Sequence, residues 1–142
     1  MIQLRLIEIE KDYPAFCDWW AGHGWPALPK SILPKRGVMA CDAAKDGAGV
    51  AAAWLYMDNS TGVSMMEWLV TNPQSGGKET LRAINAVIGF LTERALELDY
   101  GMMLTSCRQP SLVRVLEKNG FRKTDEGVTH LLKITSTMKE AE

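Results

Sequence analysis

The stretch Ser111-Leu112-Val113-Arg114-Val115-Leu116-Glu117-Lys118-Asn119-Gly120-Phe121 is the most informative part of this sequence. Its apolar residues Leu112, Val115 and Leu116 recur at helical spacing and form one face, while the charged residues lie largely off that face. Gly120 stands where a helix commonly ends in the left-handed conformation, which glycine adopts without a steric penalty. The stretch therefore predicts a short amphipathic helix that ends at Asn-Gly, with an aromatic residue opening a strand.

The segments before this helix predict a β-α-β unit. Apolar residues at three- and four-residue steps predict a long helix over residues 77–98: Leu81, Ile84, Ile88, Leu91, Ala95 and Leu98. A strand-like run at 63–71 precedes the helix, and a buried-type strand at 102–105 follows it. Because one helix joins them, we expect these two strands to be parallel, with a right-handed crossover.

The remaining segments complete a mixed sheet. Residues 3–9 alternate like a strand, and turn signals at 45–47 and 58–62 separate strands at 38–41, 50–57 and 63–71, which predicts an antiparallel meander. Residues 121–124 and 128–134 predict a closing hairpin, followed by a polar, frayed tail at 135–142.

The aromatic segment 10–34 predicts an irregular covering layer over the sheet. Asp12 is expected to cap a short helix, with Pro14 tolerated in its first turn. Trp19 and Trp20 are adjacent, so on a helix they should diverge rather than face one core wall. These aromatic residues are expected to form a hydrophobic lid, although they could also bind an apolar or cationic acceptor.

The amino-acid composition is typical of a globular protein. The 142 residues are 46% hydrophobic and 23% charged, which predicts a single globular domain over residues 1–142. The formal net charge of -1 favours neither nucleic acid nor anionic membrane as a partner. Three widely spaced cysteines (Cys17, Cys41 and Cys107) and two histidines predict no disulfide framework and no metal site. A reducing, cytoplasmic setting is the corresponding expectation.

Two features of the sequence indicate a possible binding site and a possible catalytic group. The loop at 72–80 leaves a strand and starts a helix, so free backbone N–H groups and the positive end of the helix dipole favour phosphate there. The alternative is an ordinary glycine-rich turn. Glu67 lies between apolar neighbours, where desolvation would raise its pKa and suit it to act as a general base. Its alternative is a place on the solvent side of an alternating strand.

The order loop, helix, strand, helix and Gly-Phe resembles the second half of the GNAT family, the acetyl-CoA-dependent N-acyltransferases. Together with Trp-Trp and Gly-Trp-Pro at 19–26 and Glu-Trp-Leu-Val at 67–70, it is similar to small GNAT-like proteins common in bacteriophage genomes. The resemblance implies an α/β fold with a mixed, mostly antiparallel sheet and helices on both faces. It also implies a V-shaped opening between the strands at 63–71 and 101–106.

The resemblance further implies acetyl-CoA as the acyl donor, transfer to an amine of a small molecule or protein by direct attack, and Glu67 as the catalytic base. The implied coenzyme-binding residues are Leu69, Val70, Thr71, Gln74, Ser75, Gly76, Gly77, Lys78, Glu79, Thr80, Ser106, Ser111 and Arg114.

The sequence departs from the family pattern at two positions. Glu79 occupies a small-residue position of the phosphate loop, where a carboxylate would repel phosphate unless it turns outward or Lys78 offsets it. Leu116 stands where the family often has a tyrosine that protonates the departing thiolate, so Ser106, Cys107, Ser111 or water would have to replace it.

These departures leave alternatives to catalysis open. The fold could serve as a binding or interaction protein of phage origin acting in the host cytoplasm, or as a coenzyme-binding regulator without turnover. Many members of this fold dimerise, so the resemblance allows a homodimer, although no surface in the sequence indicates an interface.

Overall fold

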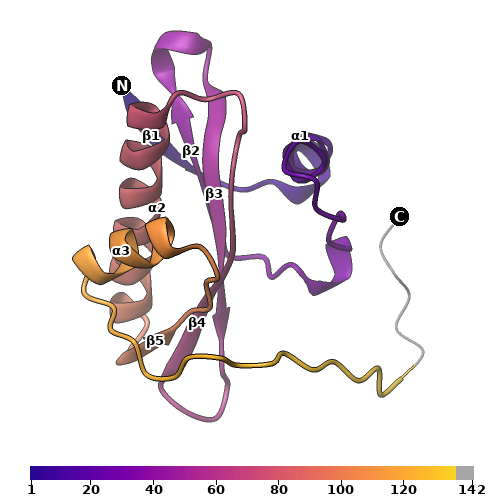
Figure 1. The fold of residues 1–142 in the computed structure, drawn as a ribbon, viewed down its shortest axis with the longest axis vertical. Helices are drawn as coiled ribbons and strands as arrows, with labels where there is room; N and C mark the ends of the chain where they lie inside the picture. The colour runs from indigo at the N-terminus through magenta and orange to yellow at the C-terminus, as the bar shows by residue number, and fades with distance from the viewer. Residues whose placement is uncertain (137–142) are drawn as a thin grey trace.

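The computed structural model describes residues 1–136, which form one mixed sheet with helices on both faces (Figure 1). The strands of this part of the chain lie in sequence order: β1 (Ile2–Leu6), β2 (Gly37–Asp42), β3 (Ala48–Met57), β4 (Val63–Thr71) and β5 (Met102–Leu104). Pairing is antiparallel from β1 to β4 and parallel between β4 and β5. The predicted meander and the predicted parallel pair are thus confirmed.

Helices α2 (Gly77–Glu97) and α3 (Pro110–Lys118) cover one face of the sheet, and α1 (Ile9–Gly22) covers the other (Figure 1). The apolar stripe of α2 packs on small and branched residues of the central strands, so α2 can lie close to the sheet. This core contains Val38, Ala51, Ala53, Leu55, Met66, Ile84, Val87, Ile88 and Leu91. Single 3₁₀ turns at Lys30–Ile32 and Ala43–Lys45 complete the regular structure of the described residues. None of the described helices has the length and apolar character needed to cross a membrane.

A second, aromatic core lies between α1 and the sheet. Phe16 is fully buried and makes edge-to-face contacts with Trp19 and Trp54, at ring-centroid distances of 5.3 Å and 5.1 Å. Trp20 is buried in the same cluster, so the prediction that Trp19 and Trp20 face different walls is wrong. The indoles are large enough to reach the sheet from neighbouring helix positions. Trp19 extends over Gly49, where a Cβ would lie 2.8 Å from its ring.

The prediction of an irregular segment over residues 10–34 is wrong for residues 10–22, which are helical, whereas residues 23–34 contain only the 3₁₀ turn at Lys30–Ile32. The strand ends at Leu6 rather than Ile9, and α1 starts at Ile9 and continues for 14 residues. Pro14 lies inside the helix rather than in its first turn. Asp12 is not the N-cap residue; its carboxylate instead accepts a hydrogen bond from the backbone N–H of Glu8, at 2.8 Å, from within the helix.

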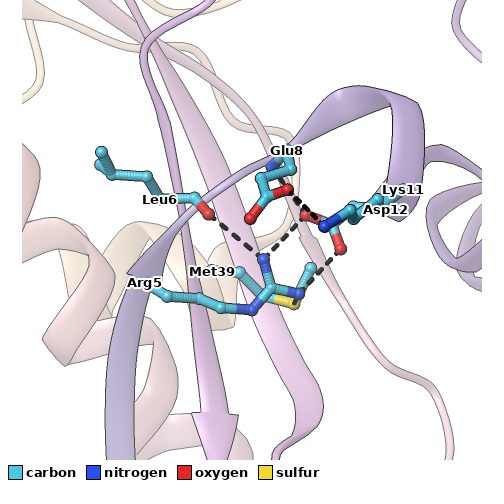
Figure 2. Close-up of polar contacts among 6 residues, drawn as sticks. All are labelled: Arg5, Leu6, Glu8, Lys11, Asp12 and Met39. Carbon is cyan, nitrogen blue, oxygen red and sulfur yellow. Dashed lines mark hydrogen bonds and ion pairs between the residues drawn. The ribbon is translucent and has the colours of Figure 1, made fainter.

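Asp12 also binds the start of α1 to the sheet (Figure 2). The two terminal nitrogens of Arg5 donate to the two carboxylate oxygens of Asp12, at 2.8 and 2.7 Å. Arg5 additionally donates to the carbonyl oxygen of Leu6, at 3.2 Å. This paired geometry is the strong form of an arginine–carboxylate contact, and it holds the pKa of Asp12 below its usual value.

The predicted C-terminal hairpin does not form in this structure. Residues 121–136 contain neither strand nor helix, and residues 122–136 are all exposed. The prediction rested on two strand-like runs around the turn Asp125-Glu126-Gly127, but none of the described strands pairs with the segment. The final six residues of the predicted frayed tail, 137–142, lie outside the described residues.

Candidate active site

A β-bulge in β4 gives the candidate site its shape. Ala52 pairs with Val70 and Trp54 pairs with Glu67, so two β4 residues, Trp68 and Leu69, lie opposite one residue of β3. Trp68 adopts a left-handed backbone with φ of 62°, which is unusual for a bulky residue. Such a bulge bends the strand and leaves a residue outside the regular ladder. It also redirects the indole of Trp68, which is 41% exposed.

The predicted V-shaped opening lies next to the bulge. Pairing between β4 and β5 ends at Met65 and Leu104, because β5 stops at Leu104 rather than at the predicted Thr105. Thr105 then bridges the two strands at the start of the opening, its hydroxyl donating to the carbonyl oxygen of Met66 at 2.6 Å. Beyond this bridge, residues Glu67 to Thr71 of β4 still pair with β3 on one side, but on their other side, which faces β5 earlier in the strand, they have no strand partner among the described residues.

Glu67 lies where the opening begins. It is paired with Trp54, and directly paired antiparallel residues share a face, so its carboxylate lies on the α1 side of the sheet. The side chain is half-buried, and desolvation raises its pKa to about 7. The neighbouring Ser106 hydroxyl opposes this rise in part. The structure therefore brings together two of the sequence-predicted residues, Glu67 and Ser106.

Tyr56 joins the bulge to the loop before β2. Its hydroxyl donates to the carbonyl oxygen of Ile32 and accepts a hydrogen bond from the indole N–H of Trp68, at 2.7 Å. Burial raises the pKa of the Tyr56 phenol, and the negative charge of Glu67 raises it further. Sequence reasoning missed Tyr56, because nothing in the sequence signals the left-handed Trp68 that directs the indole toward it.

The loop at 72–80, which was predicted to bind phosphate and is called the phosphate loop below, follows directly from β4, and Asn72 holds it in place. The backbone N–H of Asn72 donates to Val50 at 2.8 Å, and its side-chain amide donates to Gly49 at 3.0 Å. The same side chain accepts from the N–H of Gln74 at 3.0 Å, which is the Asx turn that asparagine favours. Asn72 was not predicted as a functional residue, although an asparagine before a proline is a recognised turn signal.

His23, at the end of α1, supports the loop from the other side. Its Nε2 lies 2.9 Å from the carbonyl oxygen of Thr71, and its ring stacks on Trp25 at a centroid distance of 4.5 Å. The preceding Gly22 contacts Pro73 so closely that a Cβ there would lie 2.6 Å from the proline ring. The aromatic segment therefore positions the phosphate loop as well as covering the sheet.

The loop offers an open helix N-terminus. Helix α2 begins at Gly77, its N-cap Gly76 provides no side-chain cap, and a Cβ at either glycine would meet no atom within 4 Å. The first N–H groups of a helix have no partner within the helix, so they are available at an unobstructed surface. The N–H of Thr80 is already used, since it donates to Gly76. These residues fit the pyrophosphate of a coenzyme.

The negative charge of Glu79 is offset by Lys45, which was not among the predicted residues. Its carboxylate lies 3.5 Å from the ammonium of Lys45, which follows β2, and it is only 19% exposed. The carboxylate is thus turned toward the end of β2, and the ion pair reduces its repulsion of an anion at Gly77.

The remaining candidates differ in what their side chains can contribute to the site. Val70 is buried in the aromatic core and Leu69 packs partly on the α2 core, so only their backbones face the opening. Lys78 is exposed on α2, and Ser111 and Arg114 are exposed on α3. Within residues 1–136 no hydrogen bond or ion pair joins Ser111 or Arg114 to the loop. Leu116 is buried in the core, so it presents nothing to the opening.

Comparisons with known proteins address the fold. No protein-family model matches the sequence, and no curated protein sequence matches it. Solved structures do match: an acetyltransferase of Trypanosoma brucei has a TM-score of 0.66 at 20% identity, with 93% of this chain and 100% of that chain covered. A ribosomal-protein-alanine N-acetyltransferase of Brucella melitensis matches with a TM-score of 0.64 at 18% identity, covering 94% and 100%.

A GNAT family protein of Streptococcus pneumoniae matches with a TM-score of 0.56 at 14% identity, covering 95% of this chain and 98% of that chain. At these identities the likeness concerns the fold. The chain has the GNAT acetyltransferase fold, as the resemblance in its sequence predicted.

Proposed function

We propose that this protein is an acyl-CoA-dependent N-acyltransferase that uses Glu67 as its general base. The observation that carries the proposal is that Glu67 is half-buried beside the bulge, where β4 has no partner on the side of the opening. There its pKa is about 7. A base is most effective when its pKa lies near the operating pH. At neutral pH, Glu67 is therefore ionised in a large fraction of molecules and still basic enough to accept a proton from an amine.

The coenzyme would lie along the opening. The first turn of α2 and the loop at 74–79 would hold the pyrophosphate, and backbone groups on the unpaired edge of β4 would align the acyl-bearing arm. Acetyl-CoA, when bound, supplies the activated acyl group. The acceptor amine would approach from the α1 side, where the Glu67 carboxylate and the Trp68 indole lie.

Proton delivery to the departing thiolate needs a group other than Leu116. Ser106 is exposed and its hydroxyl is close enough to Glu67 to affect the pKa of that carboxyl, so it could pass on a proton, as could a water molecule. Cys107 is less suitable, because its thiol already contacts the carbonyl oxygen of Gln109 at 3.5 Å. A coenzyme A thiolate is a tolerable leaving group, so this step does not require a tyrosine.

The test is release of free thiol from acetyl-CoA with a panel of amines: amino acids, polyamines, amino sugars and peptide N-termini. Glu67→Gln should lower turnover roughly 10²-fold or more, as expected for loss of a general base, with acetyl-CoA affinity retained. Glu93→Gln, an exposed substitution on α2, is the matched control and should leave turnover unchanged. Equal turnover by wild type and Glu67→Gln would remove Glu67 from this role.

A second candidate is a GNAT-fold interaction protein without turnover, such as a phage protein that acts on a host or virion partner. The buried Leu116 at the expected acid position favours it. The two candidates differ in one measurable property, because an enzyme of this kind must bind acetyl-CoA and an interaction protein need not.

A further inference from the structure

The side chain of Trp68 is exposed at a place where the backbone does not favour a tryptophan. Its backbone is left-handed, with φ of 62°, and its side chain is 41% exposed. A bulky residue in this conformation costs free energy unless its surroundings hold it there, and such residues cluster at functional sites. The proposed acyl transfer brings the amine close to this indole but gives the indole no role in binding it.

The indole lies on the same face of the sheet as the proposed base. Tyr56 and Trp54 are two residues apart in β3, so their side chains point to one face, and Glu67 shares this face because it pairs with Trp54. The indole N–H of Trp68 donates to the hydroxyl of Tyr56 at 2.7 Å. This hydrogen bond therefore holds the indole on the α1 side of the sheet, next to Glu67.

A cavity of about 900 Å³ begins beside these residues. Tyr56 and Met65 line it, and Met65 lies two residues before Glu67 on the same face of β4, about 7 Å along the strand. The side chain of Met65 is 42% exposed. Further apolar side chains line the cavity beyond them: Pro34 and Val63. The volume is in the range that accepts a small molecule, so an amine at Glu67 would have the rest of its molecule against an apolar surface.

The charged residues of the cavity oppose a second cation. Lys35 and Arg36 line it, and the Nε atom of Arg36 is buried without a hydrogen-bond partner in the described part of the chain. The carboxylate of Asp58, which also lines the cavity, already accepts hydrogen bonds from the backbone N–H groups of Ser60 and Thr61 in its own turn. The described lining therefore has an excess of positive charge, which repels a further ammonium group.

We propose that the acceptor is a primary amine carried on an uncharged, apolar group, and that Trp68 and Met65 form the surface that binds this group. The inference rests on the proposed function, because acyl transfer requires an amine at Glu67. The ammonium form of the amine is attracted to the Glu67 carboxylate and to the face of the neighbouring indole. The apolar group is then removed from water against Trp68 and Met65, whereas a second ammonium would meet Lys35 and Arg36.

The first test compares three acceptors that have the same five-carbon chain. They are pentylamine, the amino alcohol with a hydroxyl at the far end, and the diamine cadaverine. With saturating acetyl-CoA, kcat/KM for pentylamine should exceed that for each of the others about tenfold or more, because burying a hydroxyl or a second charge is costly. Equal values for the three acceptors, or a preference for either polar one, would overturn the proposal.

Substitutions at Trp68 test its role through the ratio of kcat/KM for pentylamine to that for the amino alcohol. A general loss of catalysis lowers both values equally and leaves the ratio unchanged. Trp68→Gly removes the indole and tolerates the left-handed backbone, so the ratio should fall to about twofold or less. Trp68→Phe keeps an aromatic face and should keep most of the preference. Leu98→Ala, at a residue that is 40% exposed at the C-terminal end of α2, is the control and should keep all of it. An unchanged ratio in Trp68→Gly would overturn the proposal.

A binding measurement separates this inference from the proposed function. The NMR signal of the Trp68 indole N–H is identified by its loss in Trp68→Phe, and the wild type is titrated with each of the three amines. Pentylamine should shift this signal at a concentration about tenfold lower than the amino alcohol or cadaverine. That result without any acyl transfer would contradict the proposed function and retain the apolar amine site. Acyl transfer without a preference for pentylamine would do the reverse, and a Trp68 signal that none of the amines shifts would refute the site.

Lys35 provides a separate test of the exclusion of a second cation. Lys35→Met removes one positive charge from the cavity lining, so kcat/KM for cadaverine should rise severalfold relative to that for pentylamine. Lys11→Met removes an exposed lysine from α1, outside the cavity lining, and should leave this ratio unchanged. The same ratio in Lys35→Met and in the wild type would show that Lys35 does not discriminate against the diamine.

Discussion

The indole N–H of Trp68 donates a hydrogen bond to the phenolic oxygen of Tyr56 at 2.7 Å, and this contact joins the bulge of β4 to the neighbouring strand. Because Tyr56 donates in turn to Ile32, the contact also connects the bulge to the loop that precedes β2. Glu67 is next to Trp68 in sequence, so the contact helps fix the strand that carries the proposed base.

Tyr56→Phe should therefore disturb catalysis more than folding. Loss of the hydroxyl removes two hydrogen bonds, and we expect a loss of about 1–2 kcal/mol in the free energy of unfolding. We also expect lower turnover at an unchanged Kd for acetyl-CoA. Urea denaturation measures the free energy of unfolding, thiol release measures the turnover, and calorimetry measures the Kd. Tyr100→Phe is the control, because Tyr100 makes a comparable hydrogen bond to Asp58 in the β3–β4 turn region. Equal effects of the two substitutions on turnover would argue against a positioning role for Tyr56.

The raised pKa of Glu67 predicts a pH-dependent stability. The folded protein keeps the Glu67 proton up to pH about 7, whereas the unfolded chain releases it near 4.5. Stability contributed by the protonated form is therefore present below the unfolded pKa and is lost as the pH rises toward 7. Relative to Glu67→Gln, the wild type should lose stability between about pH 4.5 and about pH 7, as measured by urea denaturation across this range. A constant difference would show that the pKa of Glu67 is not raised.

The lowered pKa of Asp12, which is paired with Arg5, predicts the opposite dependence of stability on pH. The pKa of Asp12 is lowered, chiefly by the hydrogen bond from Arg5, so its stabilisation is present above 3.8 and is lost as the pH falls through the lowered value. Asp12→Asn should cost about 1–3 kcal/mol at neutral pH and should abolish this acid dependence.

The exposed Lys11–Glu8 pair, at 3.1 Å, supplies the comparison for Asp12. Lys11→Met should cost less than about 0.5 kcal/mol, because exposed pairs of this spacing contribute little. If the two substitutions cost the same, Asp12 would not bind the start of α1 to the sheet in the way the geometry indicates.

His23 should influence coenzyme affinity without touching the coenzyme. Its contact with the carbonyl oxygen of Thr71 supports the start of the phosphate loop, so His23→Ala should raise the Kd for acetyl-CoA about fivefold, the equivalent of one hydrogen bond of about 1 kcal/mol. His130→Ala, in the exposed C-terminal segment, should leave the Kd unchanged. An unchanged Kd in His23→Ala would mean that the loop holds its shape without this contact.

The parts of the fold that could be predicted are those governed by periodicity. The stripe of α2 follows from burial of one helix face, whereas β2 and the middle of β3 are buried on both faces and were recognised from the turn signals that bound them. Glu67 was identified because desolvation by its apolar neighbours would raise its pKa. A short helix capped by Asp12 was predicted, but its start and length were wrong, since Pro14 and the glycines after it indicate turns while the burial of Phe16, Trp19 and Trp20 stabilises a longer helix.

Contacts between distant segments could not be predicted in the same way. The bulge depends on the pairing register of β3 and β4, and the Lys45–Glu79 ion pair depends on the end of β2 lying beside the start of α2. A C-terminal hairpin was predicted, but residues 121–136 form neither strand nor helix, because a strand-like sequence does not specify whether a sheet edge will lie beside it.

Calorimetric titration with acetyl-CoA tests the central claim most directly, because every catalytic role proposed here requires this ligand. We predict binding in the micromolar range by the wild type and markedly weaker binding by Gly77→Val, whose side chain would fill the open surface at the start of α2. Gly89→Val, in the interior of the same helix where a Cβ also meets no neighbour, should bind as the wild type does. No detectable binding by the wild type up to millimolar acetyl-CoA would contradict the account and leave the interaction protein as the better explanation of this fold.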